Sequence, residues 1–315
     1  MQAIHVFWTA PYRARGIDIG VNLVMPPLEC LVLAASALVW RAHSGGMKLF
    51  TDTPGRACVE RWGIADLWSK IDCAVLDAAP DDVDPAVFWD FGKTLALAAC
   101  ETPVAMLDLD LVVWRALEVQ AAVQFLHWEE IEEPWYPPLG VLPVPPGYDF
   151  PEVELSVRPG NTALVYIGDP RFRDRFVAES LAYAQRNAPN GDQKLAAFLF
   201  SGQRLFTIIG ALGPWDMRPF IPYIHRAHGA GEWVGKPPTS RNPLDPLAFL
   251  DGWPYMHLWS FKHLLRKDRE TADQFAAKLI DHARTVAPHA ADRLHAIWQY
   301  LCVSVADLSQ ERSYS

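Results

Sequence analysis

The chain has 315 residues, of which half are hydrophobic and about a fifth are charged, so it is long enough and apolar enough to form a globular protein with a large core. Its formal net charge of −9 gives no basic footprint for nucleic acid, which we exclude as an expected partner. An anionic substrate would have to be held by local cations or by a metal, since the overall field repels it.

The five cysteines are scattered without CxxC spacing, which indicates reduced thiols in a cytoplasmic protein and disfavours a zinc site. The N-terminus lacks the basic and apolar regions of a signal peptide. The apolar runs are too short, or too interrupted by charge, to span a bilayer. We therefore expect a cytoplasmic protein without a transmembrane segment, while association with a membrane through a partner or a lipid-linked acceptor stays open.

Short apolar runs alternate with helical patterns in the first third of the chain. In chain order, the pattern predicts a strand at 3–8, a helix at 27–41, a strand at 47–51, a helix at 57–62, a strand at 71–76, a helix over 84–98 and a strand at 104–107. Asp84 and Pro85 are suited to the N-cap and first position of the last of these helices. This alternation is typical of right-handed βαβ units and a largely parallel sheet.

The pattern changes after Trp128. Segment 129–160 is rich in proline and acidic residues, and 229–252 is a second loop rich in glycine and proline; long segments of this kind inside a domain are usually functional. Strands are expected at 161–168 and 207–212, and helices at 172–188, 192–200, 268–286 and 290–305. The predicted fold class is α/β, with a Rossmann-like, mixed but mostly parallel sheet flanked by helices, and with C-terminal helices.

Asp108 and Asp110 directly follow the strand predicted at 104–107. Open parallel sheets bind ligands at the carboxyl ends of their strands. Two carboxylates two residues apart in extended chain can face the same side and bind a hard divalent cation, Mg²⁺ or Mn²⁺. Two solvated carboxylates at the end of a strand would give the same pattern. The apolar flanks favour a functional site, because charges between buried runs are costly.

The segment from Phe91-Gly-Lys93 to Leu107-Asp-Leu-Asp110 resembles the helix, strand and DxD motif of retaining GT-A glycosyltransferases, and especially the family of lipopolysaccharide galactosyl- and glucosyltransferases and glycogenin. Later segments match further motifs of that family in order. They are Asn161-Thr-Ala-Leu-Val165, Asp192-Gln-Lys-Leu195 and His257-Leu-Trp-Ser-Phe-Lys262. The resemblance covers about residues 3–263. It departs from the family where Lys262 comes one residue early, where the family's glycine before it is missing and where Lys93 replaces arginine.

This resemblance implies a GT-A domain over 1–265, with a nucleotide-sugar half at about 1–115, an acceptor half at about 116–265 and a helical extension at 266–315. It implies that His257 completes a Mn²⁺ or Mg²⁺ site with Asp108 and Asp110, and that Lys262 pairs with the diphosphate of the donor. Lys93 would steady the carboxylates or contact phosphate. An aromatic-cluster histidine and solvated surface lysines are the alternative interpretations of these three basic residues.

The resemblance also implies roles for residues that bind the nucleoside and the sugar. Trp8 and Thr9 follow the first strand, where base and ribose bind in this fold, and Asp52 at the end of the second strand would contact the nucleoside. Asp192 would bind hydroxyls of the donor sugar, and Gln193 would lie near the anomeric carbon. The alternatives are a core tryptophan at Trp8, a turn residue at Asp52 and a helix N-terminus at 192–193.

The expected function is therefore a metal-dependent, retaining hexosyltransferase that uses a nucleotide-sugar donor, a UDP-sugar, and a glycan or other hydroxyl-bearing acceptor. The long loops should border the acceptor cleft, with Trp135, Tyr136 and Trp233 available to stack on sugars. A sugar nucleotidyltransferase is one alternative, although the loop after the first strand lacks the expected glycines. A GT-A-like protein that only binds glycans is another.

Overall fold

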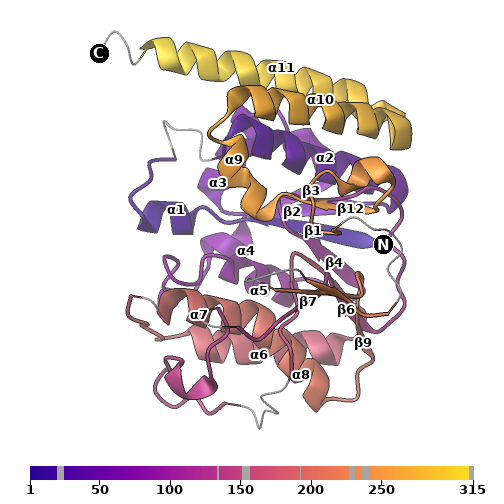
Figure 1. Ribbon diagram of the computed structural model, residues 1–315. Coiled ribbons are helices and arrows are strands. Elements are labelled where there is room, and N and C mark those ends of the chain that lie inside the picture. Colours follow the sequence, from indigo (N-terminus) through magenta and orange to yellow (C-terminus); the bar gives the residue numbers. More distant parts are fainter. Residues whose placement is uncertain are drawn as a thin grey trace.

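The computed structural model describes residues 1–19, 25–132, 135–150, 157–191, 193–226, 231–235 and 242–311 (Figure 1). Its central sheet has seven strands in the order β3-β2-β1-β4-β8-β6-β9. The strands are β1 Gln2–Phe7, β2 Met47–Thr51, β3 Lys70–Asp72, β4 Val104–Leu107, β6 Val123–Phe125, β8 Leu164–Ile167 and β9 Met217–Pro219. All of them run in one direction except β8, which is antiparallel to β4 and β6. The predicted fold class is thus confirmed.

Helices cover both faces of this sheet (Figure 1). One layer contains α2 Pro27–His43, α10 Arg269–Val286 and α11 Pro288–Glu311, and the other contains α5 Phe91–Ala98, α6 Pro170–Ala184, α7 Gln193–Leu199 and α8 Leu205–Leu212. Successive side chains of a strand point to opposite faces. Accordingly Ala3 and Phe7 of β1 belong to the core cluster under α2, while Ile4 and Val6 belong to the cluster under α5 and α6.

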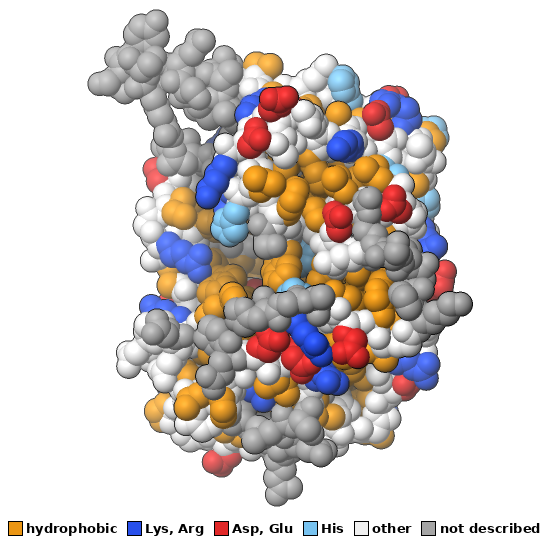
Figure 2. All heavy atoms as spheres, in the orientation of Figure 1, with side chains coloured by type: hydrophobic (Ala, Val, Ile, Leu, Met, Phe, Trp, Pro, Cys, Tyr) orange, Lys and Arg blue, Asp and Glu red, His pale blue; other side chains and the backbone are white. Residues whose placement is uncertain are grey.

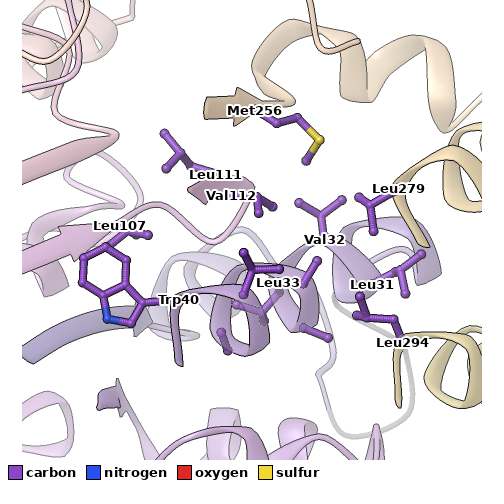
Figure 3. Packing of buried hydrophobic residues seen from close by; sticks show 14 of the residues in the cluster. Leu31, Val32, Leu33, Trp40, Leu107, Leu111, Val112, Met256, Leu279 and Leu294 are labelled. Carbon is purple, nitrogen blue, oxygen red and sulfur yellow. The ribbon is translucent and has the colours of Figure 1, made fainter. Parts of the chain in front are cut away.

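Helix α2 is buried between the sheet and the C-terminal helices (Figure 3). Its Leu31, Val32 and Leu33 are fully buried. They share one cluster with Leu111 and Val112, with Met256, and with Leu279 of α10 and Leu294 of α11. Burial of each such side chain stabilises the fold by roughly 1.5–3 kcal/mol. The C-terminal helices are therefore part of the same hydrophobic core as the sheet.

Two small sheets extend the structure beyond the end of β4. Strand β5 Leu111–Val113 pairs antiparallel with β12 Tyr255–His257, and Leu111 lies opposite His257. Strand β10 Tyr223–His225 pairs with β7 Trp128–Glu129 and with β11 Glu232–Trp233. These pairings bring residues from the last third of the chain back to the carboxyl end of β4.

Several elements occur where the sequence predicts them. Strands β2 and β4 have the predicted bounds, and α2 extends the helix predicted at 27–41 to His43. Strand β8 and helix α6 confirm the elements predicted around 161–168 and 172–188. Helices α10 and α11 confirm the predicted pair at the C-terminus. The remaining helices are α1 Ala10–Ala14, α3 Thr53–Arg61, α4 Ala74–Asp77 and α9 Lys262–Leu265.

Four predictions of local structure differ from the structure, three in their bounds and one in its type. The strand predicted at 71–76 ends at Asp72, and α4 follows it. The helix predicted from Asp84 begins only at Phe91, because Asp84 caps a local turn by accepting from the Ala86 N–H at 2.8 Å. Helix α3 begins at Thr53, four residues before its predicted start. The strand predicted at 207–212 is helix α8, since a short apolar run does not distinguish a strand from a buried helix.

Helices α7 and α8 are joined without a break by a π-helical segment, Phe200–Arg204. Among the described residues, the stretch Gln193–Leu212 has the length and apolar composition of a membrane span, so the expectation that the apolar runs are too short or too charged is wrong for this one. Of its most apolar window, 67% is buried inside the protein, as in the core helix of a folded domain. Side chains of this stretch also reach the cavity described below.

Candidate metal centre and substrate cavity

Asp108 and Asp110 lie in the turn between β4 and β5, at the carboxyl end of the parallel strands. The Asp108 N–H donates to the Ala163 carbonyl at 2.7 Å, and the Leu111 N–H donates to the Asp108 carbonyl at 3.2 Å. The β5–β12 pairing then brings in His257 from the other end of the chain. The two carboxylates and the imidazole are thus positioned by backbone hydrogen bonds on both sides of the turn.

One ligand atom from each of Asp108, Asp110 and His257 lies within 4.8 Å of the others, which makes them a group able to hold a metal ion. The His257 Nε2 is 3.5 Å from Asp110 Oδ1 and 4.0 Å from Asp108 Oδ2. Asp110 and His257 are almost buried, whereas Asp108 is partly exposed. The structure therefore brings together the three residues that the sequence predicted as metal ligands.

Two lysines flank this group. The Lys93 Nζ, on α5, lies 2.5 Å from Asp108 Oδ1 and 3.8 Å from Asp90 Oδ2. The Lys262 Nζ, at the start of α9, lies 2.8 Å from Asp110 Oδ2. That oxygen also accepts a hydrogen bond from the Trp259 N–H at 3.1 Å. Each carboxylate of the DxD pair is thus matched to one ammonium group.

Burial and charge act against each other at these groups. Burial opposes ionisation of Asp110, but His257 and Lys262 outweigh it and hold the pKa of Asp110 well below its usual range. Burial likewise opposes the charge of Lys93, but Asp108 and Asp90 outweigh it and raise the lysine pKa. Burial raises the pKa of Asp90 to about 6, although Lys93 opposes the shift. The charged forms of Asp110 and Lys93 therefore persist at neutral pH.

The donor set fits a divalent cation. It offers carboxylate oxygens and one imidazole nitrogen, which suit Mn²⁺ or Mg²⁺, with the nitrogen better matched to Mn²⁺. Asp108 Oδ1 is buried, and the Lys93 ammonium pairs with it at 2.5 Å. A cation bound at this centre would take the place of that ammonium as the partner of the carboxylate.

A cavity of about 850 Å³ opens beside this centre. Figure 2 shows a hollow across the middle of one face, with hydrophobic side chains gathered around it. Its walls combine the ion-pair residues above with aromatic side chains and glutamates. The aromatic and acidic residues include Trp8, Tyr12, Trp89, Trp135, Tyr136, Phe198, Trp259, Glu129, Glu130 and Glu132. A cavity of this size and composition is suited to a small-molecule substrate, since such sites occupy roughly 300–1,000 Å³.

Of the residues predicted to bind the nucleoside, Trp8 lines the cavity and is mostly buried against Gly92. Thr9 and Asp52 instead bind one another. Asp52 is 1% exposed and accepts from the Thr9 hydroxyl at 2.6 Å and from the Gly55 N–H at 3.0 Å, as the N-cap of α3. Neither Thr9 nor Asp52 is among the cavity-lining residues. A direct contact of these two with a nucleoside stays a prediction.

The two residues predicted to act on the donor sugar lie at the start of α7. Asp192 falls outside the described residues. The Gln193 side chain is exposed and donates to the Val141 carbonyl at 3.2 Å. Further along the same helix, Leu195, Phe198 and Leu199 do line the cavity. The roles of Asp192 and Gln193 stay predictions.

Segment 129–160, predicted to border the substrate cleft, contributes cavity residues from Glu129 to Tyr136. Among the described residues of segment 229–252, none lines the cavity. Trp233 packs edge-on against Tyr223 and Trp253, with ring centroids 5.4 and 5.7 Å apart. The first loop is thus part of the site in this structure.

Several cavity residues were not singled out from the sequence. Trp89 stacks on Phe198, with ring centroids 3.7 Å apart, and the Arg15 guanidinium lies 5.1 Å from the Trp89 ring. Glu129 on β7 accepts from the Asn161 amide at 2.8 Å. The residues in these contacts are 32 to 109 positions apart in the sequence, so no local pattern predicts the contacts. The acidic run after Trp128 and the motif that begins at Asn161 are the signals in the sequence that point to this wall.

No protein-family model matches this sequence, and no curated protein sequence matches it. Among solved structures, the chain is similar to mouse xyloside xylosyltransferase 1 in its apo form. The two share 14% sequence identity, the match covers 70% of this chain and 85% of that one, and the TM-score is 0.33. At that TM-score the overlap is too loose to carry a role over from that protein.

Proposed function

We propose that this protein is a metal-dependent glycosyltransferase that transfers a sugar from a nucleotide diphosphate sugar to an acceptor hydroxyl. The observation that carries the proposal is the group of Asp108, Asp110 and His257 at the carboxyl end of β4, flanked by Lys93 and Lys262 and open to a cavity. The DxD resemblance of the sequence points to the same residues.

The charges of this centre suit a diphosphate. The two lysines offset the two aspartates, so a divalent cation would leave two positive charges there. A bound Mn²⁺ or Mg²⁺ stabilises the negative charge that develops on a departing nucleoside diphosphate. When a cation binds Asp108 and Asp110, their present ion-pair partners Lys93 and Lys262 would be free to pair with phosphate oxygens. Because the chain as a whole is acidic, this local centre is what would retain an anionic donor.

The rest of the donor would occupy the neighbouring wall. Trp8, which follows β1, offers an aromatic surface for the nucleoside. Thr9 and Asp52, which are hydrogen-bonded to each other next to Trp8, would support the nucleoside end of the cavity. We further propose UDP as the nucleotide and a retaining reaction, with Asp192 and Gln193 at the sugar. Support for the last point is the position of α7, whose later residues line the cavity.

The domain assignment stays a proposal as well. Residues 1–265 would form the catalytic unit and 266–315 a helical extension in a cytoplasmic enzyme. The close packing of α10 and α11 on α2 means that the extension cannot be removed without exposing the core. A truncated chain ending near residue 265 is therefore expected to be insoluble or unfolded.

A hydrolysis screen over nucleotide sugars tests the proposal. Wild-type protein with Mn²⁺ should release the nucleoside diphosphate from at least one UDP-sugar, and EDTA or Asp110→Asn should abolish the release. Asp281→Asn, an exposed aspartate on α10, is the matched control and should retain full activity. Release that persists in EDTA and in Asp110→Asn would contradict the proposal. Turnover of a nucleoside triphosphate with a sugar phosphate would instead indicate a nucleotidyltransferase.

A further inference from the structure

A second polar wall of the cavity is built around Glu129 and Asn161. The Asn161 N–H donates to the His127 carbonyl at 2.8 Å, and the Glu129 N–H donates to the Pro159 carbonyl at 2.8 Å. The side chains are then fixed relative to each other. Asn161 Oδ1 accepts from the Ala163 N–H at 3.0 Å, so its Nδ2 is left to donate to Glu129 Oε1 at 2.8 Å. Both residues line the cavity.

The surroundings of this pair disfavour a phosphate. Glu130 and Glu132 line the same wall, and two arginines, Arg158 and Arg226, already pair with the Glu130 carboxylate at 3.4 and 3.8 Å. A diphosphate at this wall would meet carboxyl groups, whereas the metal centre offers it cations. The occupant of this wall should therefore be uncharged.

The chemistry of Glu129 suits a hydroxyl group. The residue is 7% exposed, and burial raises the pKa of its carboxyl to about 8, against the opposing effect of Asn161. At neutral pH the carboxyl is mostly protonated, so it can donate one hydrogen bond and accept others. A sugar hydroxyl also donates and accepts, and it would leave neither partner unsatisfied.

The other walls suit the apolar faces of a sugar ring. Trp135 and Trp259 are 38% and 45% exposed, although both line the cavity. Tyr136 also lines the cavity, where it is buried and donates a hydrogen bond to Gln203. Flat aromatic surfaces with a few fixed polar groups pack against the C–H faces of a pyranose while the polar groups bind its edge.

We propose that Glu129 and Asn161 bind the hydroxyl groups of a neutral carbohydrate acceptor, and that the exposed indole of Trp135 packs against its ring. This inference rests on the proposed glycosyltransferase function and adds the class of acceptor and the residues that select it. The metal centre holds the charged donor, and the Glu129 wall holds the uncharged acceptor, so that one cavity receives both.

Saturation-transfer NMR tests this assignment. The probes are the methyl glycosides of glucose, galactose, mannose and xylose, added to the full chain with UDP and Mn²⁺. Wild-type protein should transfer saturation to at least one glycoside. Glu129→Ala should reduce that transfer at least fivefold, whereas Glu129→Gln should keep most of it, because an amide also donates and accepts. Glu270→Ala, an exposed glutamate on α10, is the matched control and should behave as wild type.

UDP affinity, measured in the same samples, separates the possible failures. A loss of glycoside binding at unchanged UDP affinity is the expected result for Glu129→Ala, and a purely structural role would not produce it. If wild-type protein binds UDP but no glycoside, or if Glu129→Ala binds glycoside as wild type does, this inference is overturned and the proposed function stands. If neither UDP nor another nucleoside diphosphate binds, the proposed function fails. If Glu129→Ala does not fold, Trp135→Ala, a change at an exposed position, tests the same assignment. Glycoside binding by Trp135→Ala that equals the wild-type binding would overturn it.

Discussion

Replacing Glu129 by Gln should change how the stability of the protein depends on pH. Burial raises the pKa of the Glu129 carboxyl from its ordinary value of 4.5 to about 8 in the folded chain. A carboxyl of this kind binds its proton more tightly in the folded state than in the unfolded state. Its contribution to stability is therefore fully present below about pH 4.5 and is lost as the pH rises toward 8. Glutamine does not titrate and removes this dependence.

The size of the effect follows from the shift. Each unit of pKa difference corresponds to about 1.4 kcal/mol. Between pH 6 and pH 8 the unfolded carboxyl is ionised while the folded one stays largely protonated, so wild-type protein should lose about 2 kcal/mol relative to Glu129→Gln. For a domain of this size, 1 kcal/mol changes the melting temperature by roughly 2 °C. The two proteins should thus diverge by about 4 °C over this pH range.

Thermal unfolding followed by circular dichroism at pH 6, 7 and 8 measures the difference. The melting temperature of Glu129→Gln minus that of wild type should increase steadily with pH. Glu130→Gln is the matched control for removing one carboxyl group from the same wall, and it shows how much of any change comes from net charge. If the Glu129→Gln and wild-type curves run parallel from pH 6 to 8, Glu129 is not held protonated by its burial, and the reasoning about its hydrogen bonding is refuted.

Three other variants have defined outcomes. Lys262→Met should weaken UDP binding, measured by calorimetry in the presence of Mn²⁺, by roughly ten- to a hundredfold, because a hydrogen bond to a charged group contributes about 1.5–3 kcal/mol. An unchanged affinity would show that Lys262 does not contact the donor. Gly160→Ala should destabilise the fold by about 1–3 kcal/mol in chemical denaturation, because an added Cβ would lie 2.7 Å from Phe125, and full stability would refute this close packing. Asp52→Ala should lower stability by about 2–4 kcal/mol, since it removes the cap of α3 and leaves the buried Thr9 hydroxyl unpaired. A normal melting temperature with lost UDP binding would show instead that Asp52 contacts the nucleoside.

The parts of the fold that could be predicted are those whose signals are local. Strand β4 and the carboxylates after it lie within one short stretch, so an apolar run followed by Asp108 and Asp110 sufficed. The alternation of strands and helices likewise predicted the mostly parallel sheet. The segment of helix α8 was predicted as a strand because its apolar residues show no helical period. The structure explains this, since successive residues such as Ile208 and Ile209 are both buried, and an apolar run without periodicity does not distinguish a strand from a helix.

The parts of the site that could not be predicted depend on pairing across the chain. His257 reaches Asp110 only because β12 pairs with β5, and its place came from the order of motifs and not from spacing. Glu129 contacts Asn161 across 32 residues of sequence. The acidic run after Trp128 and the motif that begins at Asn161 each mark one partner, but neither pattern predicts that the two side chains meet. The sequence was compatible with a turn residue or a ligand contact at Asp52, but its burial and its four protein donors make it a helix cap in this structure.

Calorimetric titration of UDP, with and without Mn²⁺, tests the metal centre most directly. Wild-type protein should bind UDP in the presence of Mn²⁺, EDTA should abolish this binding and added Mn²⁺ should restore it. Asp110→Asn should remove the response to Mn²⁺ while the protein keeps its fold, as judged by circular dichroism, because one of the three clustered ligands loses its charge. Equal UDP affinity with and without the metal, or an Asp110→Asn variant that responds to Mn²⁺ as wild type does, would contradict the assignment of this site.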